Sequence, residues 1–458
     1  MSHRQQERGL FGTDGVRGVA NRELTPELAL ALGRAVAGRL GRGARVVVGR
    51  DTRRSGAMLE GALAAGLASA GADVLVAGVV PTPAVADLVV DSAAAAGAVI
   101  SASHNPFPDN GIKLFGPDGF KLPDAEEALI EGSLAEAGER PEGAALGAIE
   151  AWPEARERYL AFLLGREAPD LAGLRLAVDC ANGATVLTAP EALRRLGAEV
   201  DVLGGDPDGL NINHACGSTH LDGVCAAVRE GGHDAGLAFD GDGDRVLAVD
   251  GEGRPVDGDQ ILAICALAMR GAGTLANDAV VTTTVTNLGF RRAMAAAGVT
   301  VRWTDVGDRY VLEEMRRNGD VLGGEQSGHM INLRHGPTGD GLATALQLLG
   351  ALRERGEPLA DAAGIVVRSP QLLLNVTVAD PRTRLARADA VWAEVRAFEG
   401  ALGEEGRVVV RASGTEPLVR VMVEAPTEEA CQSWARRIAA TVDRELGAHA
   451  STAARPGG

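Results

Sequence analysis

The sequence predicts an α/β protein of four domains: three related α/β units with mainly parallel mixed sheets, followed by a C-terminal α+β unit. Its 458 residues are too many for one hydrophobic core, so two to four domains are expected. Three times along the chain, a helical pattern ends at a glycine, an apolar strand follows, and the strand leads into a polar loop. This alternation is typical of strands that are joined by crossover helices and therefore run parallel.

The domain boundaries lie where this alternation restarts or changes. We expect the α/β domains to span residues 1–152, 153–257 and 258–367, and the α+β domain to span residues 368–448. Residues 449–458 contain no apolar pattern, and we expect them to form a disordered tail.

Each element is predicted from an apolar run bounded by glycine, proline or polar residues. The first domain should contain a helix at 24–40, a strand at 44–49, a polar loop at 50–53, a helix at 57–70, a strand at 73–80 and, after a further helix, a strand at 98–101. The second should contain strands at 174–179, 198–204 and 235–239 and a helix at 189–197. The third should contain strands at 279–285, 299–307 and 320–324 and a helix at 289–298. The fourth should contain strands at 372–378, 406–413 and 418–425 and helices at 386–399 and 428–446.

Composition and charge exclude several classes of function. The net charge of -17 and the 3% aromatic content argue against nucleic acid as a partner. No run of about 18 apolar residues is present, so no membrane partner is expected. Five cysteines without CxxC spacing are typical of a reducing, cytoplasmic compartment. An anionic small molecule would have to be held by local arginines and backbone N–H groups, and the chain itself would be a monomer or homodimer.

The segment 99–122 contains the first candidate catalytic residues. Ser103 and His104 follow an apolar strand, and in open α/β sheets ligands bind at that edge. The only two lysines of the chain, Lys113 and Lys121, lie in the same segment. Lysine can release its proton when buried, whereas arginine cannot, so we expect Lys113 to transfer protons. His104 is a further catalytic candidate, although a hydrogen bond within its own loop would also explain it.

Asp240, Asp242 and Asp244 alternate along one loop and predict a metal site. An EF-hand is excluded, because its sixth position would be Arg245 and its twelfth Gly251. Three close carboxylates with a phosphate oxygen suit Mg²⁺ better than a self-contained Ca²⁺ site. The alternative is an acidic surface turn, which the apolar runs on both sides make less favourable.

Two further loops offer groups for binding a phosphorylated sugar. The loop 323–329 offers Glu325, Ser327 and His329, which suit sugar hydroxyls but could equally form an ordinary turn. The segment 411–420 follows a strand and offers donors for a phosphate: Arg411, Ser413, Gly414, Thr415 and Arg420. Neither lysine is followed by Ser or Thr, so no Walker A motif exists, and the phosphate must already be carried by the protein or its substrate.

Together these loops resemble the α-D-phosphohexomutase superfamily along nearly the whole chain. The motifs are FGTDGVRG (11–18), SASHNP (101–106), DNGIK (109–113), GLNINHACGSTH (209–220), DGDGDR (240–245), VGDRYV (306–311), GGEQSGH (323–329), TGDG (338–341) and RASGTEP (411–417). Three of them, at 211–220, 306–311 and 324–329, are most similar to the branch that isomerises glucosamine phosphates. Pro108 departs from the pattern, because the family often has an aromatic residue there.

The resemblance implies a heart-shaped enzyme whose four domains each give one loop to a central cleft. Ser103 would be carried as phosphoserine, with Mg²⁺ held by a phosphoserine oxygen and Asp240, Asp242 and Asp244. It would convert glucosamine 6-phosphate to glucosamine 1-phosphate through glucosamine 1,6-bisphosphate, and closure of the fourth domain over the substrate would exclude water. The implied catalytic and substrate-binding residues are Arg17, His104, Lys113, Arg245, Gly307, Glu325, Ser327, His329, Arg411, Ser413, Gly414, Thr415 and Arg420.

Three other functions remain open from the sequence. A phosphomannomutase/phosphoglucomutase of the same superfamily would differ chiefly in the loop 323–329 and in substrate preference. A non-catalytic phosphosugar-binding protein would be expected to lack the serine or an aspartate, and all are present. A phosphoserine-type phosphatase, which would use Ser103 in the same way, would release free phosphate instead of an isomer.

Overall fold

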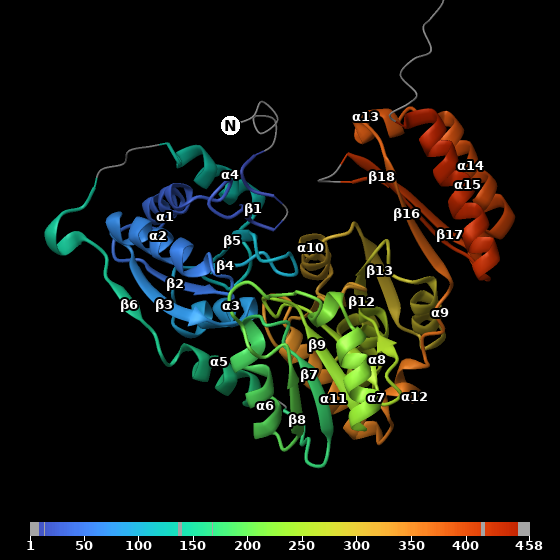
Figure 1. Ribbon diagram of the computed structural model, residues 1–458, viewed down its shortest axis with the longest axis horizontal. Coiled ribbons are helices and arrows are strands. Elements are labelled where there is room, and N and C mark those ends of the chain that lie inside the picture. Colours follow the sequence, from blue (N-terminus) through green and yellow to red (C-terminus); the bar gives the residue numbers. More distant parts are fainter. Residues whose placement is uncertain (1–8, 13, 136–139, 167, 414–416, 448–458) are drawn as a thin grey trace, which may run out of the picture. The chain divides into compact units, whose positions relative to one another are not determined.

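The computed structural model describes residues 9–447 except 13, 136–139, 167 and 414–416 (Figure 1). The chain divides into two compact units. The first comprises the chain up to Val281 together with Gly307–Gly364, and the second comprises Thr282–Val306 together with the chain from Ile365 onward. The predicted tail at 449–458 lies outside the described residues.

The first sheet carries the Ser103 loop at one end. Its strand order is β1-β5-β4-β2-β3-β6. The strands are β1 (Val16–Val19), β2 (Arg45–Arg50), β3 (Asp73–Val79), β4 (Ala96–Ile100), β5 (Asp109–Phe115) and β6 (Ile149–Ala151). Strands β2, β3, β4 and β6 are parallel, whereas β5 is antiparallel to both β4 and β1. Ser103 therefore lies between two antiparallel neighbours and not in a crossover.

Two helices of this domain pack closely through glycines. The helices are α1 (Pro26–Leu40), α2 (Gly56–Ser69), α3 (Thr82–Asp91), α4 (Asp124–Ser133) and α5 (Ala155–Leu164). In Figure 1, α1 and α2 lie side by side along the first sheet. A Cβ on Gly33 would lie 2.4 Å from the Leu63 carbonyl oxygen, and one on Gly66 would lie 2.2 Å from that of Leu30. Only glycine at these positions permits this approach of the two backbones.

The second sheet carries the acidic loop between two of its strands. Its order is β11-β10-β9-β7-β8. The elements are β7 (Arg175–Asp179), α6 (Ala189–Arg195), β8 (Glu199–Leu203), α7 (Asp222–Gly231), β9 (Ala235–Phe239), β10 (Val246–Asp250) and β11 (Pro255–Val256). Strand β7 is parallel to β8 and β9, and β10 is antiparallel to β9. Strand β9 is buried throughout, so the loop that follows starts from within the core.

The third sheet has the order β13-β12-β14-β15, and the division between the two units falls within β12. The elements are α8 (Gly258–Gly271), β12 (Ala279–Thr283), α9 (Leu288–Ala296), β13 (Thr300–Thr304), α10 (Asp308–Asn318), β14 (Leu322–Gly324), β15 (Met330–Asn332), α11 (Gly341–Arg355) and α12 (Leu359–Ala363). The hairpin of β14 and β15 presents the loop 325–329.

The last sheet is antiparallel, with the order β16-β18-β17. Its elements are β16 (Gln371–Thr377), α13 (Pro381–Leu385), α14 (Asp389–Leu402), β17 (Arg407–Ala412), β18 (Leu418–Glu424) and α15 (Glu428–Leu446). Helices α14 and α15 lie together against this sheet (Figure 1), and Val391, Phe398, Val421 and Ile438 form part of the core between them.

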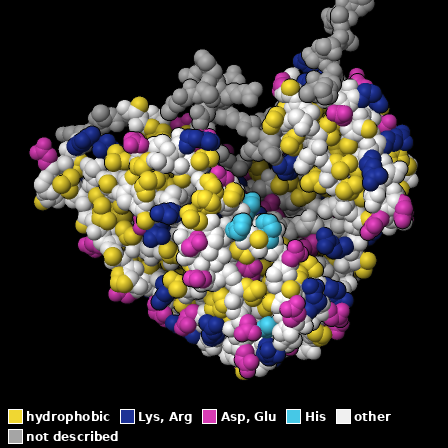
Figure 2. Space-filling view, viewed as in Figure 1, with side chains coloured by type: hydrophobic (Ala, Val, Ile, Leu, Met, Phe, Trp, Pro, Cys, Tyr) yellow, Lys and Arg dark blue, Asp and Glu magenta, His cyan; other side chains and the backbone are white. Residues whose placement is uncertain are grey.

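The predicted fold class is confirmed: α/β domains with mixed sheets precede a C-terminal α+β domain. The apolar runs also formed strands close to their expected bounds. The strands β1, β5, β6, β10, β11 and β15 and the helices α4, α5, α7, α8, α10, α11, α12 and α13 were not predicted. None of the helices within the described ranges is both long and apolar enough to cross a bilayer. Figure 2 shows acidic and basic side chains interspersed over the viewed face.

Candidate active site

Ser103 is buried and aimed at the acidic loop. It follows β4 by three residues, has 1% of its surface exposed, and adopts a left-handed backbone with φ 51°. Its hydroxyl donates to Oδ2 of Asp240 at 2.6 Å. A hydroxyl in hydrogen-bond contact with a carboxylate can lose its proton as it attacks, or can carry a transferred group.

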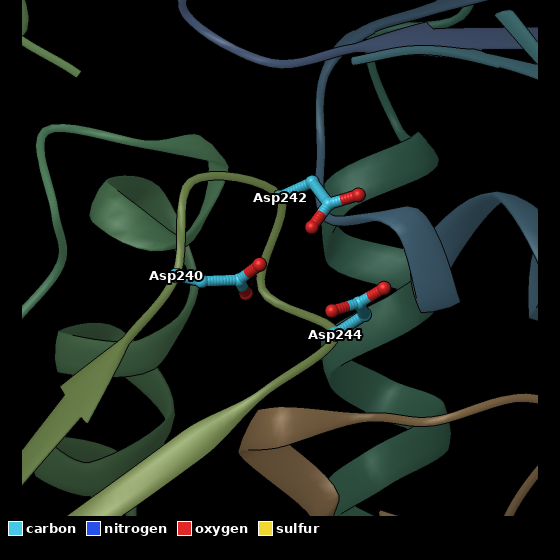
Figure 3. Close-up of side chains that lie close together, drawn as sticks. All are labelled: Asp240, Asp242 and Asp244. Carbon is cyan, nitrogen blue, oxygen red and sulfur yellow. The ribbon is translucent and has the colours of Figure 1, made fainter. Parts of the chain in front are cut away.

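The three aspartates of the β9–β10 loop converge, as Figure 3 shows. Asp240, Asp242 and Asp244 each offer an oxygen within 4.8 Å of the others, and all three are buried. Gly243 between them has φ 72°. Among the described residues, Oδ1 of Asp242 and Oδ1 of Asp244 have no hydrogen-bond partner.

The electrostatics of this cluster fit a bound cation. Burial raises the pKa of Asp240 well above its usual value, and the neighbouring charges of Asp244 and Asp242 raise it further. The pKa of Asp244 lies well below its usual value despite burial, because Lys113 and His329 lie close to it. Buried carboxylate oxygens without donors are costly unless a cation pairs with them, and hard divalent cations prefer such oxygens. The residues present therefore fit a divalent metal.

Lys113, on β5, lies against the same cluster with 1% exposure. Its Nζ is 2.9 Å from Oδ2 of Asp242, 3.1 Å from Oδ2 of Asp14 and 3.5 Å from Oδ2 of Asp244. Burial by itself lowers the pKa of Lys113, but these three carboxylates raise it above its usual value. The expectation that burial makes this lysine release its proton thus omits its neighbours, which stabilise the charged form.

Arg17 and His104 lie near this centre. Arg17 is on β1 opposite Gly111 and forms an ion pair with Asp14, which also accepts from Lys121 Nζ at 2.5 Å. His104 is half-buried, with Nδ1 3.3 Å from the Ser103 hydroxyl. Burial, with Arg245 and Arg17 nearby, lowers the pKa of His104 to about 4. His104 is therefore neutral at pH 7 in this arrangement.

The loop between β14 and β15 approaches the acidic cluster. The carboxylate of Glu325 accepts from the Gly307 N–H at 3.1 Å, and the buried hydroxyl of Ser327 has no partner among the described residues. His329 Nδ1 lies 3.6 Å from Oδ1 of Asp244, and the pKa of His329 is raised because Asp244 and Asp308 outweigh its burial.

Arg245 links this loop to the acidic one. It forms a β-bridge with His329, and its side-chain Nε lies 3.6 Å from Oδ1 of Asp244. Its backbone N–H donates to Oδ1 of Asp240 at 3.2 Å. A Cβ on Gly339 would lie 2.3 Å from Nε2 of His329, so the glycine of the TGDG segment allows the imidazole to lie flat against the chain.

The second unit contains the remaining predicted residues. Arg411 on β17 is paired directly with Arg420 on β18, and Ser413 is buried with its N–H donating to the Leu418 carbonyl. Burial and the neighbouring Arg420 both lower the pKa of Arg411. Two adjacent cations repel one another unless an anion lies between them. Gly414 and Thr415 lie outside the described residues.

Three residues that contact Lys113, Asp242 or the Ser103 loop were not predicted from the sequence. Asp14 joins Lys113, Lys121 and Arg17, and Thr82 donates to Oδ2 of Asp242 at 2.7 Å. Arg53 is buried beneath the Ser103 loop. Arg53 is buried and Asp14 is half-buried, which distinguishes them from surface charges, but burial of a single charged residue leaves no periodic signal in one sequence.

Family models match the chain in four successive segments. Residues 8–141, 157–253 and 257–368 match alpha/beta/alpha domains I, II and III of phosphoglucomutase/phosphomannomutase, and residues 373–441 match its C-terminal domain. Together these segments cover most of the chain.

Similar proteins cover nearly the full length. A phosphoglucosamine mutase of Saccharopolyspora erythraea is 56% identical over 94% of this chain and 98% of its own. A phosphoglucomutase/phosphomannomutase family protein from Burkholderia thailandensis superposes with a TM-score of 0.80 at 26% identity, covering 94% of this chain and 97% of its own. An N-acetylphosphoglucosamine mutase of Aspergillus fumigatus, solved with GlcNAc-6P and magnesium, has a TM-score of 0.66 at 18% identity, covering 94% and 95%. At 18% identity, the similarity to this last protein shows a shared fold only.

Proposed function

The chain belongs to the phosphoglucosamine mutases of the phosphohexomutase superfamily, and from this premise we propose that it interconverts glucosamine 6-phosphate and glucosamine 1-phosphate through a phosphorylated Ser103. The observation that carries this proposal is the 2.6 Å contact between the Ser103 hydroxyl and Asp240, at the edge of three converging carboxylates. A serine beside a divalent-cation site, with no nucleotide motif in the chain, suits transfer of a phosphoryl group already held by the protein.

The proposed cycle conserves the phosphoryl group. The bond from phosphorus to Ser103 Oγ breaks as a bond to the sugar O1 forms. The O1 proton passes to a base, Oγ gains a proton, and glucosamine 1,6-bisphosphate results. The intermediate then reorients in the site. Its 6-phosphoryl group passes to Ser103 Oγ, which gives up its proton, O6 gains a proton, and glucosamine 1-phosphate leaves.

We propose Mg²⁺ as the metal, held by Asp240, Asp242, Asp244 and an oxygen of phosphorylated Ser103. Bound there, it would neutralise charge on the phosphoryl oxygens during transfer. The hard oxygen donors, and the two carboxylate oxygens that accept no hydrogen bond from the described residues, support this assignment.

The remaining residues of the first unit have proposed roles in proton transfer and sugar binding. Lys113, His104 and His329 are the candidates for moving the hydroxyl protons, and Arg17 would stabilise charge on the phosphate. Glu325, Ser327 and Gly307 would accept and donate to the sugar hydroxyls, with Arg245 alongside. The raised pKa of Lys113 favours it as the acid that protonates a departing oxygen over the base that removes a proton.

Arg411, Ser413, Gly414, Thr415 and Arg420 would bind the phosphate that is not being transferred. The paired arginines on β17 and β18 support this role. We also propose that the four domains follow the predicted boundaries at 152, 257, 367 and 448, that the enzyme is cytoplasmic, and that it acts as a monomer or homodimer.

The test is ³¹P NMR of the purified protein with Mg²⁺ and a trace of sugar 1,6-bisphosphate. Parallel samples contain glucosamine 6-phosphate, glucose 6-phosphate or mannose 6-phosphate. Fast formation of the 1-phosphate from the amino sugar alone, lost in Ser103→Ala, is the expected result. Preference for glucose or mannose phosphate would replace the substrate assignment, and release of free phosphate without an isomer would overturn the mutase reaction.

A further inference from the structure

We propose that Arg53 and Asn213 are positioning residues that clamp the backbone of the Ser103 loop and thereby aim the Ser103 hydroxyl. The inference rests on the proposed function, because it assigns these residues to phosphoryl transfer at Ser103. The side chains of both residues donate to backbone carbonyls of the Ser103 loop, and neither residue was expected to act in the site.

Arg53 lies beneath the loop with 1% of its surface exposed. Its Nη2 donates to the carbonyls of Ser103 at 2.9 Å and Asn105 at 2.8 Å, and its Nη1 donates to the carbonyl of Pro106 at 2.6 Å. A guanidinium can reach three carbonyls at once because its donors form a fixed planar fork, which a lysine cannot reproduce.

Asp51 fixes the orientation of this fork. It accepts from Nε of Arg53 at 2.9 Å and from the Ser101 hydroxyl at 2.5 Å. The Ser101 oxygen in turn accepts from the Ser103 N–H at 3.0 Å. Arg53 and Asp51 therefore form one buried network that reaches both the N–H and the carbonyl of Ser103.

Asn213, which follows Ser103 by 110 residues in the chain, donates to two of the carbonyls that Arg53 binds. Its Nδ2 donates to Ser103 O at 2.9 Å and Asn105 O at 3.0 Å. Gly241, within the acidic loop, makes room for this contact. A Cβ there would lie 2.6 Å from the Ser103 oxygen and 2.7 Å from Nδ2 of Asn213.

The clamp holds a conformation that serine adopts reluctantly. A non-glycine residue in the left-handed region costs about 1 kcal/mol or more, and here Ser103 has φ 51°. Two donors on its carbonyl and one acceptor at its N–H hold that conformation, in which Oγ meets Asp240. A shift of about 1 Å in a reacting group can lower the rate about 100-fold.

Two variants test the clamp, each with a matched control. Arg53→Lys keeps the charge but removes the fork, and Arg54→Lys is its control, because Arg54 lies next to Arg53 but its side chain is exposed. Asn213→Gly removes the amide and keeps a left-handed backbone, since Asn213 has φ 58°. Asn21→Gly is its control, because Asn21 also has a left-handed backbone, with φ 61°, and is exposed.

The measurements are kcat and KM for glucosamine 6-phosphate, the melting temperature, and hydrogen exchange of the peptide at 101–107. We expect each clamp variant to lower kcat about 100-fold, to leave KM within about threefold, and to speed exchange in this peptide. The controls should match the wild type in all three. A merely structural role would instead lower the melting temperature and the active fraction without a localised gain in exchange.

The outcomes separate the clamp from the proposed reaction. If both clamp variants have the same kcat and the same hydrogen exchange at 101–107 as the wild type, the proposed clamp is wrong, while the mutase reaction is unaffected. A wild-type enzyme without mutase activity would overturn the reaction, and the exchange data alone would then decide whether Arg53 and Asn213 hold the loop. If Arg53→Lys does not fold, Asn213→Gly decides the question by the same measurements.

Discussion

At the scale of single residues, Thr82 controls which oxygen of Asp242 is available. Its hydroxyl donates to Oδ2 of Asp242 at 2.7 Å, and its N–H donates to the Asp242 carbonyl at 2.8 Å. Lys113 also binds Oδ2, at 2.9 Å, so Oδ1 is left without a hydrogen-bond partner among the described residues. Partners that orient a metal-binding carboxylate contribute to metal affinity.

The variant Thr82→Val should therefore weaken Mg²⁺ binding about tenfold or more. Valine preserves the shape of threonine but cannot donate to Asp242. The dissociation constant is measured by isothermal titration calorimetry, with Thr82→Ser as the control that retains the hydroxyl. Equal affinity in Thr82→Val and the wild type would show that Lys113 alone orients this carboxylate.

Asp340 makes the stability of the protein depend on pH. It caps helix α11 and accepts from the Tyr159 hydroxyl at 2.9 Å, and burial raises its pKa from 3.8 to about 6. Between these pH values the folded state keeps a proton that the unfolded state releases. The contribution of protonated Asp340 to the free energy of unfolding is therefore complete below pH 4 and is lost as the pH rises through 6.

We expect Asp340→Asn to remove this dependence. The free energy of unfolding of the wild type, relative to the variant, should fall between pH 4 and pH 7 by up to about 3 kcal/mol. Urea unfolding at several pH values measures it. Asp257→Asn is the control, because Asp257 caps helix α8 where it is only half-buried. Parallel pH profiles for the wild type and Asp340→Asn would contradict the prediction.

At the scale of elements, the contact of α1 with α2 depends on two glycines. Gly33→Ala would place a Cβ 2.4 Å from the Leu63 carbonyl oxygen, so the helices would have to separate. We expect this change to lower the free energy of unfolding by about 1–3 kcal/mol in denaturant titrations. Gly38→Ala on the same helix meets nothing within 4 Å and should instead stabilise by about 0.5–1 kcal/mol. Equal effects of the two substitutions would contradict this account of the packing.

The elements also show which parts of the fold and site a sequence can predict. Buried strands such as β4 and β9 form continuous apolar runs, so their positions and the polar loops after them were predicted correctly. Strand β5 was not predicted, because it begins with Asp109-Asn110-Gly111, a sequence typical of a turn. The acidic loop was predicted from its spacing, whereas Arg53 looked like an ordinary loop arginine. Its role depends on carbonyls about 50 residues away, which no local pattern encodes.

At the scale of the whole molecule, the chain between β12 and α10 belongs with the C-terminal part. Within the second unit, Glu424 accepts from the Leu288 N–H at 3.0 Å. Asn287 exchanges two hydrogen bonds with the backbone of Ser369, at 2.9 and 3.0 Å. The C-terminal strands and helices therefore use partners that precede them by more than 80 residues.

A fragment of residues 365–447 should accordingly be less stable than the same fragment fused by a flexible linker to residues 282–306. Without the added segment, the buried carboxylate of Glu424 loses a donor, at a cost of about 1–3 kcal/mol. Chemical denaturation of both fragments measures the difference. Identical denaturation midpoints would show that the C-terminal strands and helices need no partner from 282–306. Asn287→Ala in the fused fragment should lower its midpoint part of the way towards that of the unfused fragment.

The clamp on Ser103 also constrains how the enzyme can be made. Ser103 leaves the ribosome early, but Asn213 and Asp240 follow it by 110 and 137 residues. At about 5–20 residues per second, this interval lasts on the order of ten seconds. Throughout it the emerging serine has Arg53 beneath it but neither Asn213 nor the acidic loop. A chain stalled or cleaved in that interval lacks both Asn213 and the three aspartates, so we expect incomplete products of synthesis not to act on sugar phosphates.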